Sequence, residues 1–177
     1  SAWYAAYSSI GRNSPPAIWC GESWRAGNTD KLYGNTLYGF YDDMIEVCKT
    51  PEYSDYYLWQ LDHSRKKSPV IDGIYFDLMF WPACTRIDHN HGYVGKDGKR
   101  YPTWTVREHR RWLERVYIYC HENAQDAPVV THISGATSRV AGFSFADYFV
   151  DGELWCNVLV QDRSYKNMKL DQLRAEI

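Results

Sequence analysis

Short apolar runs and longer amphipathic stretches alternate along this chain, and the two patterns predict different elements. Three runs rich in β-branched and aromatic residues predict strands. They are residues 70–77 (VIDGIYFD), 127–134 (APVVTHIS) and 145–155 (FADYFVDGELW). Between the first two, an apolar stripe begins after a capping box of Thr105 and Glu108 and predicts a helix that ends around residues 121–128.

The first half of the chain gives weaker signals, because Gly and Pro interrupt it. Apolar side chains recur at helical spacing along residues 51–67, which predicts a helix. Residues 17–20 (AIWC) predict a short strand. Residues 42–49 (DDMIEVCK) predict one or two helical turns that Pro51 ends.

The order strand, helix, strand predicts parallel β/α units with right-handed connections, so the expected fold class is α/β. The connection at 135–144 is short for a full helix, and a length of 177 residues is right for one domain. The chain begins without Met and ends in the helix-like pattern LDQLRAEI, which predicts a piece of a longer protein. The compartment stays open, since a leader for secretion or for the periplasm could stand upstream.

Aromatic residues are the outlier in composition, at 16%, with 15 Tyr and 8 Trp. These side chains suit clefts that stack against sugar rings, although a Tyr-rich core or a former interface explains the excess equally well. The net charge of −2 and the absence of a long basic run disfavour nucleic acid and anionic membranes as partners. No apolar stretch reaches the length of a membrane span.

Five widely spaced cysteines without a CxxC pair disfavour a disulfide framework and a four-cysteine zinc site, but leave one or two bridges open. The loop CTRIDHNHG offers Cys84, Asp88, His89 and His91 as metal ligands. Their spacing matches no standard zinc pattern, so we expect a solvated loop, no metal and no cofactor. A metal-dependent hydrolase built on these residues and His132 stays a third alternative.

Polar residues gather at the predicted strand ends, where parallel β/α architectures collect function. Asp77 closes the first strand, and His132 and Ser134 share a face at the end of the second. In the third strand the two-residue period places one set on a single face: Asp147, Phe149, Asp151 and Glu153. Asp151 and Glu153 would stand about 6 to 7 Å apart at their α-carbons. Close carboxylates raise each other's proton affinity, so one can act as an acid while another stays ionised.

Each of these signals also has a plainer explanation. A lone Asp at a strand end more often caps a neighbouring element, a lone His is more often a hydrogen-bonded core residue, and DGE is a common turn. However, three adjacent strand ends all carry ionisable groups, and this coincidence favours a catalytic role over these alternatives.

The order and spacing of several short motifs resemble a known family. The motifs are GIYFD (73–77), Cys84, HGY (91–93), PTWTVRE (102–108), THISG (131–135), SFAD (144–147), DGE (151–153) and LDQLRAE (170–176). Together they resemble the catalytic region of glycosyl-hydrolase-like TIM-barrel domains related to glycoside hydrolase family 123, with uncharacterised bacterial relatives. The resemblance covers about residues 55–177. It implies a (β/α)8 barrel, of which residues 1–177 would form a single domain from the central to late part.

The resemblance also implies a chemistry. Family 123 enzymes act on N-acetylgalactosamine-containing glycans by substrate-assisted hydrolysis with a consecutive Asp-Glu pair, in which the Asp steadies the acetamido group and the Glu is the acid. In this chain Gly152 separates Asp151 from Glu153, which changes the geometry unless a bulge restores it. A simple two-carboxylate mechanism that uses Asp77 with Glu153 or Asp151 is an equal alternative.

The predicted function is a carbohydrate-active, glycoside hydrolase-like domain that cleaves glycosidic bonds with paired carboxylates. We expect Glu153 as general acid and Asp151 or Asp77 as nucleophile or stabiliser. The expected substrate contacts are Tyr75, Trp81, His132, Ser134 and Trp155. The expected partners are a glycan or oligosaccharide, and the rest of the parent chain or a second copy. The rival prediction is a non-catalytic glycan-binding or scaffold domain of the same barrel fold.

Overall fold

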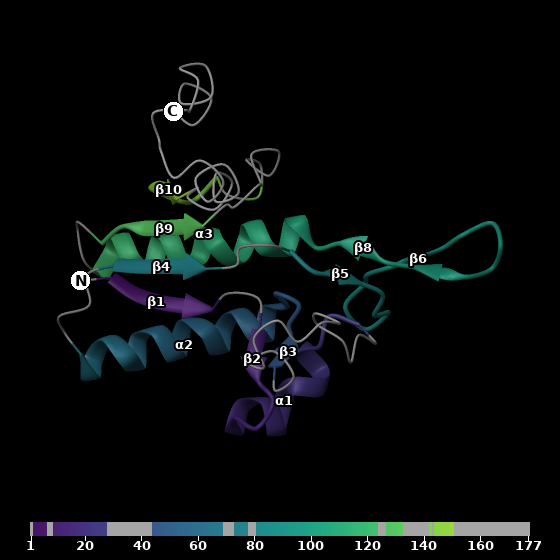
Figure 1. Cartoon of the computed structure of the whole chain (residues 1–177), viewed down its shortest axis with the longest axis horizontal. Helices are drawn as coiled ribbons and strands as arrows, with labels where there is room; N and C mark the ends of the chain where they lie inside the picture. The colour runs from purple at the N-terminus through teal and green to yellow at the C-terminus, as the bar shows by residue number, and fades with distance from the viewer. Residues whose placement is uncertain are drawn as a thin grey trace, which may run out of the picture.

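A parallel sheet forms the centre of the computed structural model (Figure 1). The structure describes residues 2–6, 9–27, 44–68, 73–77, 81–123, 127–132, 142 and 144–150. Within these residues the sheet contains β1 (Ala2–Ala6), β4 (Gly73–Asp77), β9 (Val129–His132) and β10 (Tyr148–Val150). They pair in this order, and each pair of neighbours is parallel. The four strands therefore lie side by side in the order in which they occur along the chain.

Two long helices connect the strands. Helix α2 (Pro51–Lys67) lies between β1 and β4 in the chain, and α3 (Val106–Asn123) lies between β4 and β9. The Thr50 side chain caps α2 by accepting a hydrogen bond from the Tyr53 amide at 3.3 Å, and Pro51 fits the first turn because its missing N–H is not needed there. Both predicted helices are confirmed.

The capping box predicted for α3 is replaced by other contacts. The Thr105 hydroxyl donates to the Pro82 carbonyl at 3.0 Å, and the Glu108 carboxylate lies 3.4 Å from the His91 ring. The two side chains therefore tie the start of α3 to the loop that precedes it. Helix α3 still begins at Val106, because its apolar stripe packs on the sheet.

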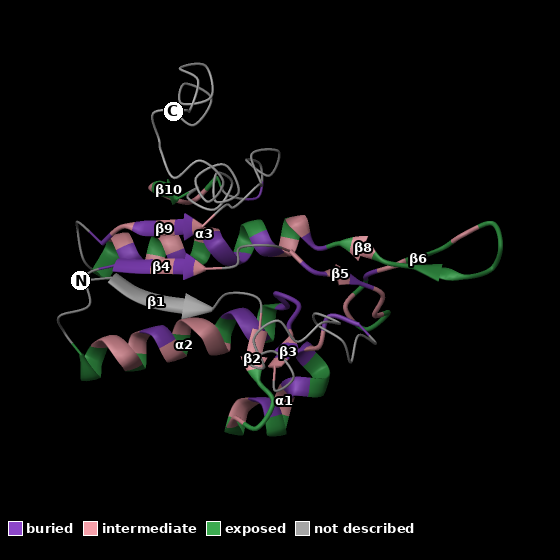
Figure 2. Ribbon diagram, in the orientation of Figure 1, coloured by how far each residue is buried: buried purple, intermediate pink, exposed green. Residues whose placement is uncertain are grey.

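Helices α2 and α3 cover the same face of the sheet. The main core cluster joins Leu61 of α2 and a stripe on α3 to Ile74, Phe76 and Val129 of β4 and β9. Because side chains alternate along a strand, Tyr75, Asp77 and His132 belong to the opposite face, where they are half-buried. Figure 2 shows the contrast between the buried strands β4 and β9 and the exposed hairpin at residues 93–101, which lies between them in the chain.

Two predictions for the first half of the chain are wrong. Residues 17–20, predicted as a strand, belong to helix α1 (Pro15–Trp24), because Pro15 and Pro16 occupy its first positions and favour a helix start. Residues 42–49, predicted as helical turns, contain strand β3 (Met44–Glu46), which pairs antiparallel with β2 (Ser9–Gly11). This distant pairing and the burial of Ile45 against Trp24 override the local pattern.

The loop after β4 forms short antiparallel pairs. Strand β5 (Ala83–Cys84) pairs with β8 (Thr103–Trp104), and β6 (Tyr93–Val94) pairs with β7 (Arg100–Tyr101). This loop and the segment with α1 and β3 both lie toward the end to which β1, β4 and β9 point (Figure 1). No helix in the described part of the chain is long and apolar enough to cross a membrane. The (β/α)8 barrel stays a prediction.

Candidate functional site

Asp77 and His132 meet at the carboxyl ends of two neighbouring strands. Phe76 of β4 pairs with Thr131 of β9, so the next residue of each strand lies beside the other. The His132 Nδ1 atom donates to Asp77 Oδ1 at 2.7 Å, with 11% and 22% of the two side chains exposed. A carboxylate at this distance orients the imidazole and favours the proton on Nδ1. The pair is thus fixed, screened from bulk water and next to the sheet edge.

The predicted substrate contacts that the structure describes lie in two different places. Tyr75 shares the face of the pair, and its ring centroid lies 6.3 Å from that of His132. Trp81 instead packs edge-on against His109 of α3, at 5.3 Å between ring centroids, and contacts the main core cluster. The structure therefore brings Tyr75 and His132 together and places Trp81 against the helix layer.

The remaining predicted site residues lie outside the described part of the chain. They are Ser134, Asp151, Glu153 and Trp155. Asp147, which we expected to share a face with Asp151 and Glu153, is described. Its Oδ2 atom accepts from the Val129 amide at 2.7 Å and lies 3.1 Å from His121 Nε2. Asp147 therefore joins the start of β9 to the last turns of α3, which is a structural role.

A second cluster brings together Cys48, Cys84, His89 and His91. One ligand atom of each lies within 4.8 Å of the others. Cys48 Sγ lies 3.3 Å from His91 Nδ1, and Cys84 Sγ lies 3.5 Å from His89 Nδ1. Both cysteines are fully buried, and His91 is buried as well. Two thiols and two imidazoles therefore converge on one point in the protein interior.

The outer nitrogens of the two histidines face oxygen acceptors. His89 Nε2 donates to the Ser23 carbonyl at 2.7 Å, and His91 Nε2 lies 3.4 Å from Glu108 Oε2. Acceptors at Nε2 favour the proton there and leave the Nδ1 lone pair directed at the thiols. The orientation of both rings is therefore the one that metal-binding histidines use.

Only part of this cluster is predictable from the sequence. The loop CTRIDHNHG offers Cys84, His89 and His91 as metal ligands, whereas Cys48 lies in a distant segment and was missed. Asp88 is not part of the cluster: it binds Arg86 at 2.5 Å between Oδ2 and Nη2, and this hydrogen bond lowers the pKa of the exposed Asp88 carboxyl to about 2. His132 is engaged with Asp77 instead.

The two thiols of the cluster differ in acidity. The pKa of Cys84 is lowered, first because the Cys48 thiol donates a hydrogen bond to it, and this effect outweighs that of burial, which raises the pKa. The pKa of Cys48 is raised, first by the same hydrogen bond to Cys84 and then by burial. The pair therefore favours a thiolate on Cys84, and a thiolate is the form that binds metals.

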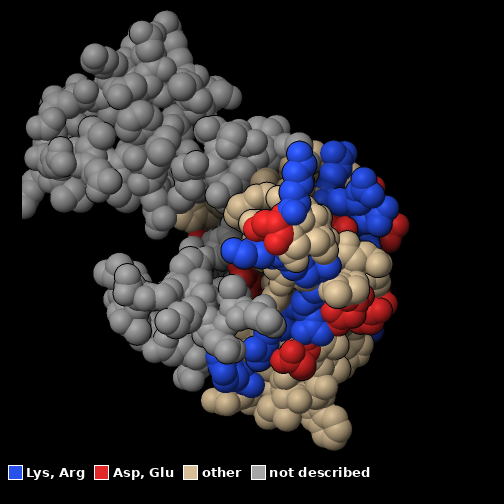
Figure 3. All heavy atoms as spheres, turned by 90° about the vertical axis from the view of Figure 1, so that its right-hand side faces the viewer, with Lys and Arg blue, Asp and Glu red and all other residues tan. Residues whose placement is uncertain are grey.

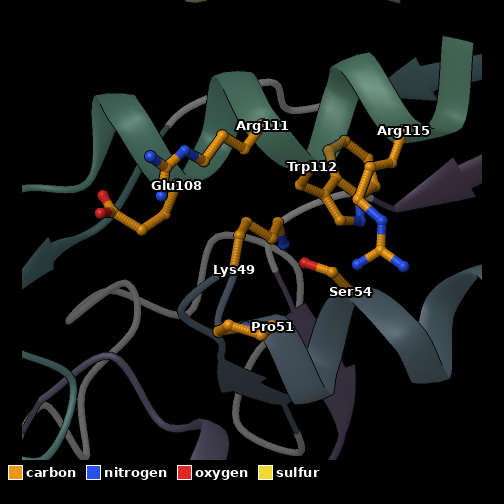
Figure 4. A pocket seen from close by; sticks show the side chains of 7 residues that line it. All are labelled: Lys49, Pro51, Ser54, Glu108, Arg111, Trp112 and Arg115. Carbon is orange, nitrogen blue, oxygen red and sulfur yellow. The ribbon is translucent and has the colours of Figure 1, made fainter.

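A small pocket lies between α2 and α3 (Figure 4). Its volume is about 140 Å³, and Lys49, Arg111 and Arg115 contribute basic groups to its lining. Lys49 is buried, with its ammonium 4.6 Å from the Tyr53 ring centroid and 5.3 Å from that of Trp112. Ligand pockets usually measure about 300–1,000 Å³, so this one is too small for an oligosaccharide. It also lies on the helix-covered side of the sheet, away from the face of Asp77.

Comparisons with known proteins leave the family open. No protein-family model, no curated protein and no solved structure matches the chain. The resemblance to domains related to glycoside hydrolase family 123 therefore stays a prediction.

Proposed function

We propose that this chain is part of a carbohydrate-active hydrolase whose cleft lies at the carboxyl edge of the parallel sheet. One observation carries the proposal: Asp77 and His132 meet at 2.7 Å, at the ends of adjacent parallel strands and on the face opposite the helices. Parallel β/α enzymes place their reacting groups at this edge. Asp77 is therefore one of the proposed active carboxylates.

The arrangement of the sheet supports a barrel of β/α units. In a TIM barrel, successive strands are neighbours and all connecting helices lie on the outer face, whereas an open doubly wound sheet reverses its strand order and has helices on both faces. Here β1, β4, β9 and β10 follow each other in chain order, and α2 and α3 share one face. The face with Tyr75 and Asp77 would then line the barrel interior.

The charge distribution favours a neutral substrate. Figure 3 shows the molecule from the carboxyl edge of the sheet. Acidic and basic side chains are mixed on the described part of this face. The net charge of the whole chain is −2. A uniformly positive surface would favour a polyanionic substrate. A neutral glycan needs no such surface, and Tyr75 beside the pair offers an aromatic face to a sugar ring.

In the proposed mechanism Asp77 acts on the anomeric carbon or stabilises its developing positive charge. His132 holds one Asp77 oxygen and contacts a sugar hydroxyl, while Asp151 or Glu153 protonates the leaving oxygen. The sheet register constrains this second carboxylate. Phe149 pairs with Thr131, on the helix side, so strict alternation would turn Asp151 away from Asp77. With Asp151 the mechanism therefore requires a break in the alternation before that residue, whereas a break at Gly152, which a glycine favours, would redirect Glu153 alone.

The rival function is non-catalytic glycan binding. The specific observation in its favour is that Asp77 already accepts a hydrogen bond from His132, an arrangement that also suits a fixed acceptor for sugar hydroxyls. Both functions predict affinity for a glycan, and turnover separates them.

The test uses the natural full-length protein that contains this chain. It is assayed for hydrolysis of a panel of nitrophenyl glycosides and oligosaccharides that includes N-acetylgalactosaminides, and for binding to the same glycans by calorimetry. We expect turnover that Asp77→Asn, Asp151→Asn or Glu153→Gln each reduces, while the surface control Asp55→Asn leaves it unchanged. Binding without turnover would support the rival function. Neither binding nor turnover would overturn both.

A further inference from the structure

We propose that Cys48, Cys84, His89 and His91 bind one zinc ion in a closed tetrahedral site. The ion would fasten the segment after β1 to the loop after β4. This inference concerns a different place from the Asp77–His132 pair and does not rest on the proposed hydrolase function.

The donor set matches zinc. Two thiolates and two imidazoles in a tetrahedron are a common zinc environment, and hard cations such as Mg²⁺ and Ca²⁺ prefer oxygen ligands instead. Zinc–sulfur and zinc–nitrogen bonds of about 2.3 and 2.0–2.1 Å imply a sulfur–nitrogen separation of about 3.5 Å in a tetrahedron. The observed separations are 3.3 Å for Cys48 and His91, and 3.5 Å for Cys84 and His89. These two donor pairs thus already stand at ligand spacing, and all four donor atoms lie within 4.8 Å of one another.

The surroundings of the histidines match zinc as well. Ligating histidines usually donate their other N–H to a backbone carbonyl or carboxylate, which fixes the tautomer. His89 has the Ser23 carbonyl at 2.7 Å, and His91 has Glu108 at 3.4 Å. In Figure 4 the Glu108 side chain extends from the first turn of α3 away from Ser54 and Lys49 of the pocket. Both rings are thus held with Nδ1 toward the cluster.

The proposed ligands come from separate parts of the chain. Cys48 follows β3, Cys84 belongs to β5, and the two histidines lie in the turn region between β5 and β6. Near the cluster, Arg86 donates hydrogen bonds to two groups of Glu22, the carboxylate at 3.1 Å and the backbone carbonyl at 2.8 Å. Ala26 packs with the two cysteines in a small buried group. A metal ion at this point would add to the interface that this small group forms among the described residues.

Four protein ligands leave no open position for a substrate, so the ion is structural. The two segments that it joins lie toward the carboxyl edge of the sheet (Figure 1). In parallel β/α folds the loops at this edge shape the substrate cleft. The metal therefore sets loop geometry and contributes to folding, without taking part in chemistry.

The test measures metal in the full chain, purified without added metal and then again after removal and return of zinc. We expect about one zinc per chain by elemental analysis, as the proposed single site requires. Cys48→Ser, Cys84→Ser, His89→Ala and His91→Ala should each lose it. The controls Cys20→Ser and His63→Ala, which remove a thiol and an imidazole elsewhere, should keep it.

Cobalt substitution of the wild-type chain tests the proposal even if the variants do not fold. Co²⁺ in the wild-type chain should give the intense visible bands of a tetrahedral ion and a thiolate charge-transfer band. Cys84→His keeps four donors, and we expect it to weaken the charge-transfer band while the ion stays bound. No metal in the wild-type chain, or a Cys48–Cys84 disulfide by mass spectrometry, would overturn the proposal. Retention of zinc by both Cys→Ser variants, or a stoichiometric metal other than zinc, would do so as well.

Discussion

Asp77 Oδ1 accepts a hydrogen bond from His132 Nδ1 at 2.7 Å, and the two residues end neighbouring parallel strands. Because both side chains are mostly buried, their interaction should be stronger than that of an exposed ion pair. The same contact holds a carboxylate in a fixed position at the sheet edge. It is therefore both a structural feature and the basis of the proposed active site.

The first prediction is energetic coupling across this pair. In a double-mutant cycle, Asp77→Ala and His132→Ala should show an interaction of about 1–3 kcal/mol in the free energy of unfolding, larger than that of the control and measured by urea titration. The control cycle uses Asp55 and Arg115, which are 2.6 Å apart and exposed, and should give about 0–1 kcal/mol. Coupling of Asp77 and His132 no larger than that of the control would show that the pair is not formed in solution.

The second prediction concerns the packing of α3 on the sheet. Leu113 is fully buried, whereas Ile118 on the same helix is 47% exposed. Leu113→Ala should lower the free energy of unfolding by about 2–5 kcal/mol, because it leaves a cavity in the core. Ile118→Ala should change it by no more than about 0.5 kcal/mol, as for other surface substitutions. Equal effects in thermal or urea unfolding would contradict the placement of this helix.

The third prediction tests the contact between the starts of β4 and β9. A Cβ atom added at Gly73 would lie 2.7 Å from both the Pro128 ring and its carbonyl oxygen. Since the carbonyl belongs to the backbone, Gly73→Ala should destabilise the fold by about 1–3 kcal/mol. Gly11→Ala is the control, because nothing lies within 4 Å of its added Cβ. Chemical denaturation of both variants measures the difference. A Gly73→Ala variant as stable as Gly11→Ala would exclude this close approach.

The fourth prediction concerns the environment of the proposed zinc ion. Glu108→Gln removes the charge beside His91 but none of the four proposed ligands. It should weaken zinc binding about 10- to 100-fold, as loss of a carboxylate behind a histidine ligand does. Competition with a fluorescent chelator measures the affinity. Glu122→Gln, at the exposed end of α3, should bind zinc as the wild type does. An unchanged affinity in Glu108→Gln would remove Glu108 from this role.

Local sequence patterns predicted the elements whose signals are also local. The β-branched run that ends at Asp77 and the stripe of α3 each bury one face, so periodicity alone locates them. Strand β3 was missed because its pairing with β2 brings together residues that are far apart in the chain. Helix α1 was missed because the apolar run at 17–20 resembles a strand, and the two prolines before it were interpreted as breakers rather than as a helix start.

The site was predictable to a similar extent. Strand ends located Asp77 and His132, because parallel strands bring their carboxyl ends to one edge. The cysteine–histidine cluster was not predictable, since Cys48 joins the other donors only after the segment after β1 packs against the loop after β4. Spacing along the chain describes only the three donors of one loop, and three such donors do not form a standard zinc motif.

The proposed role of Asp77 is tested by kcat/KM of the full-length protein and of its Asp77→Asn variant on the best substrate of the glycoside panel. Circular dichroism and thermal unfolding of both proteins check that the variant is folded. We predict a loss of about 100-fold or more with an unchanged spectrum, because in the proposed mechanism Asp77 acts on the reacting carbon. Equal activity of the two proteins would contradict it.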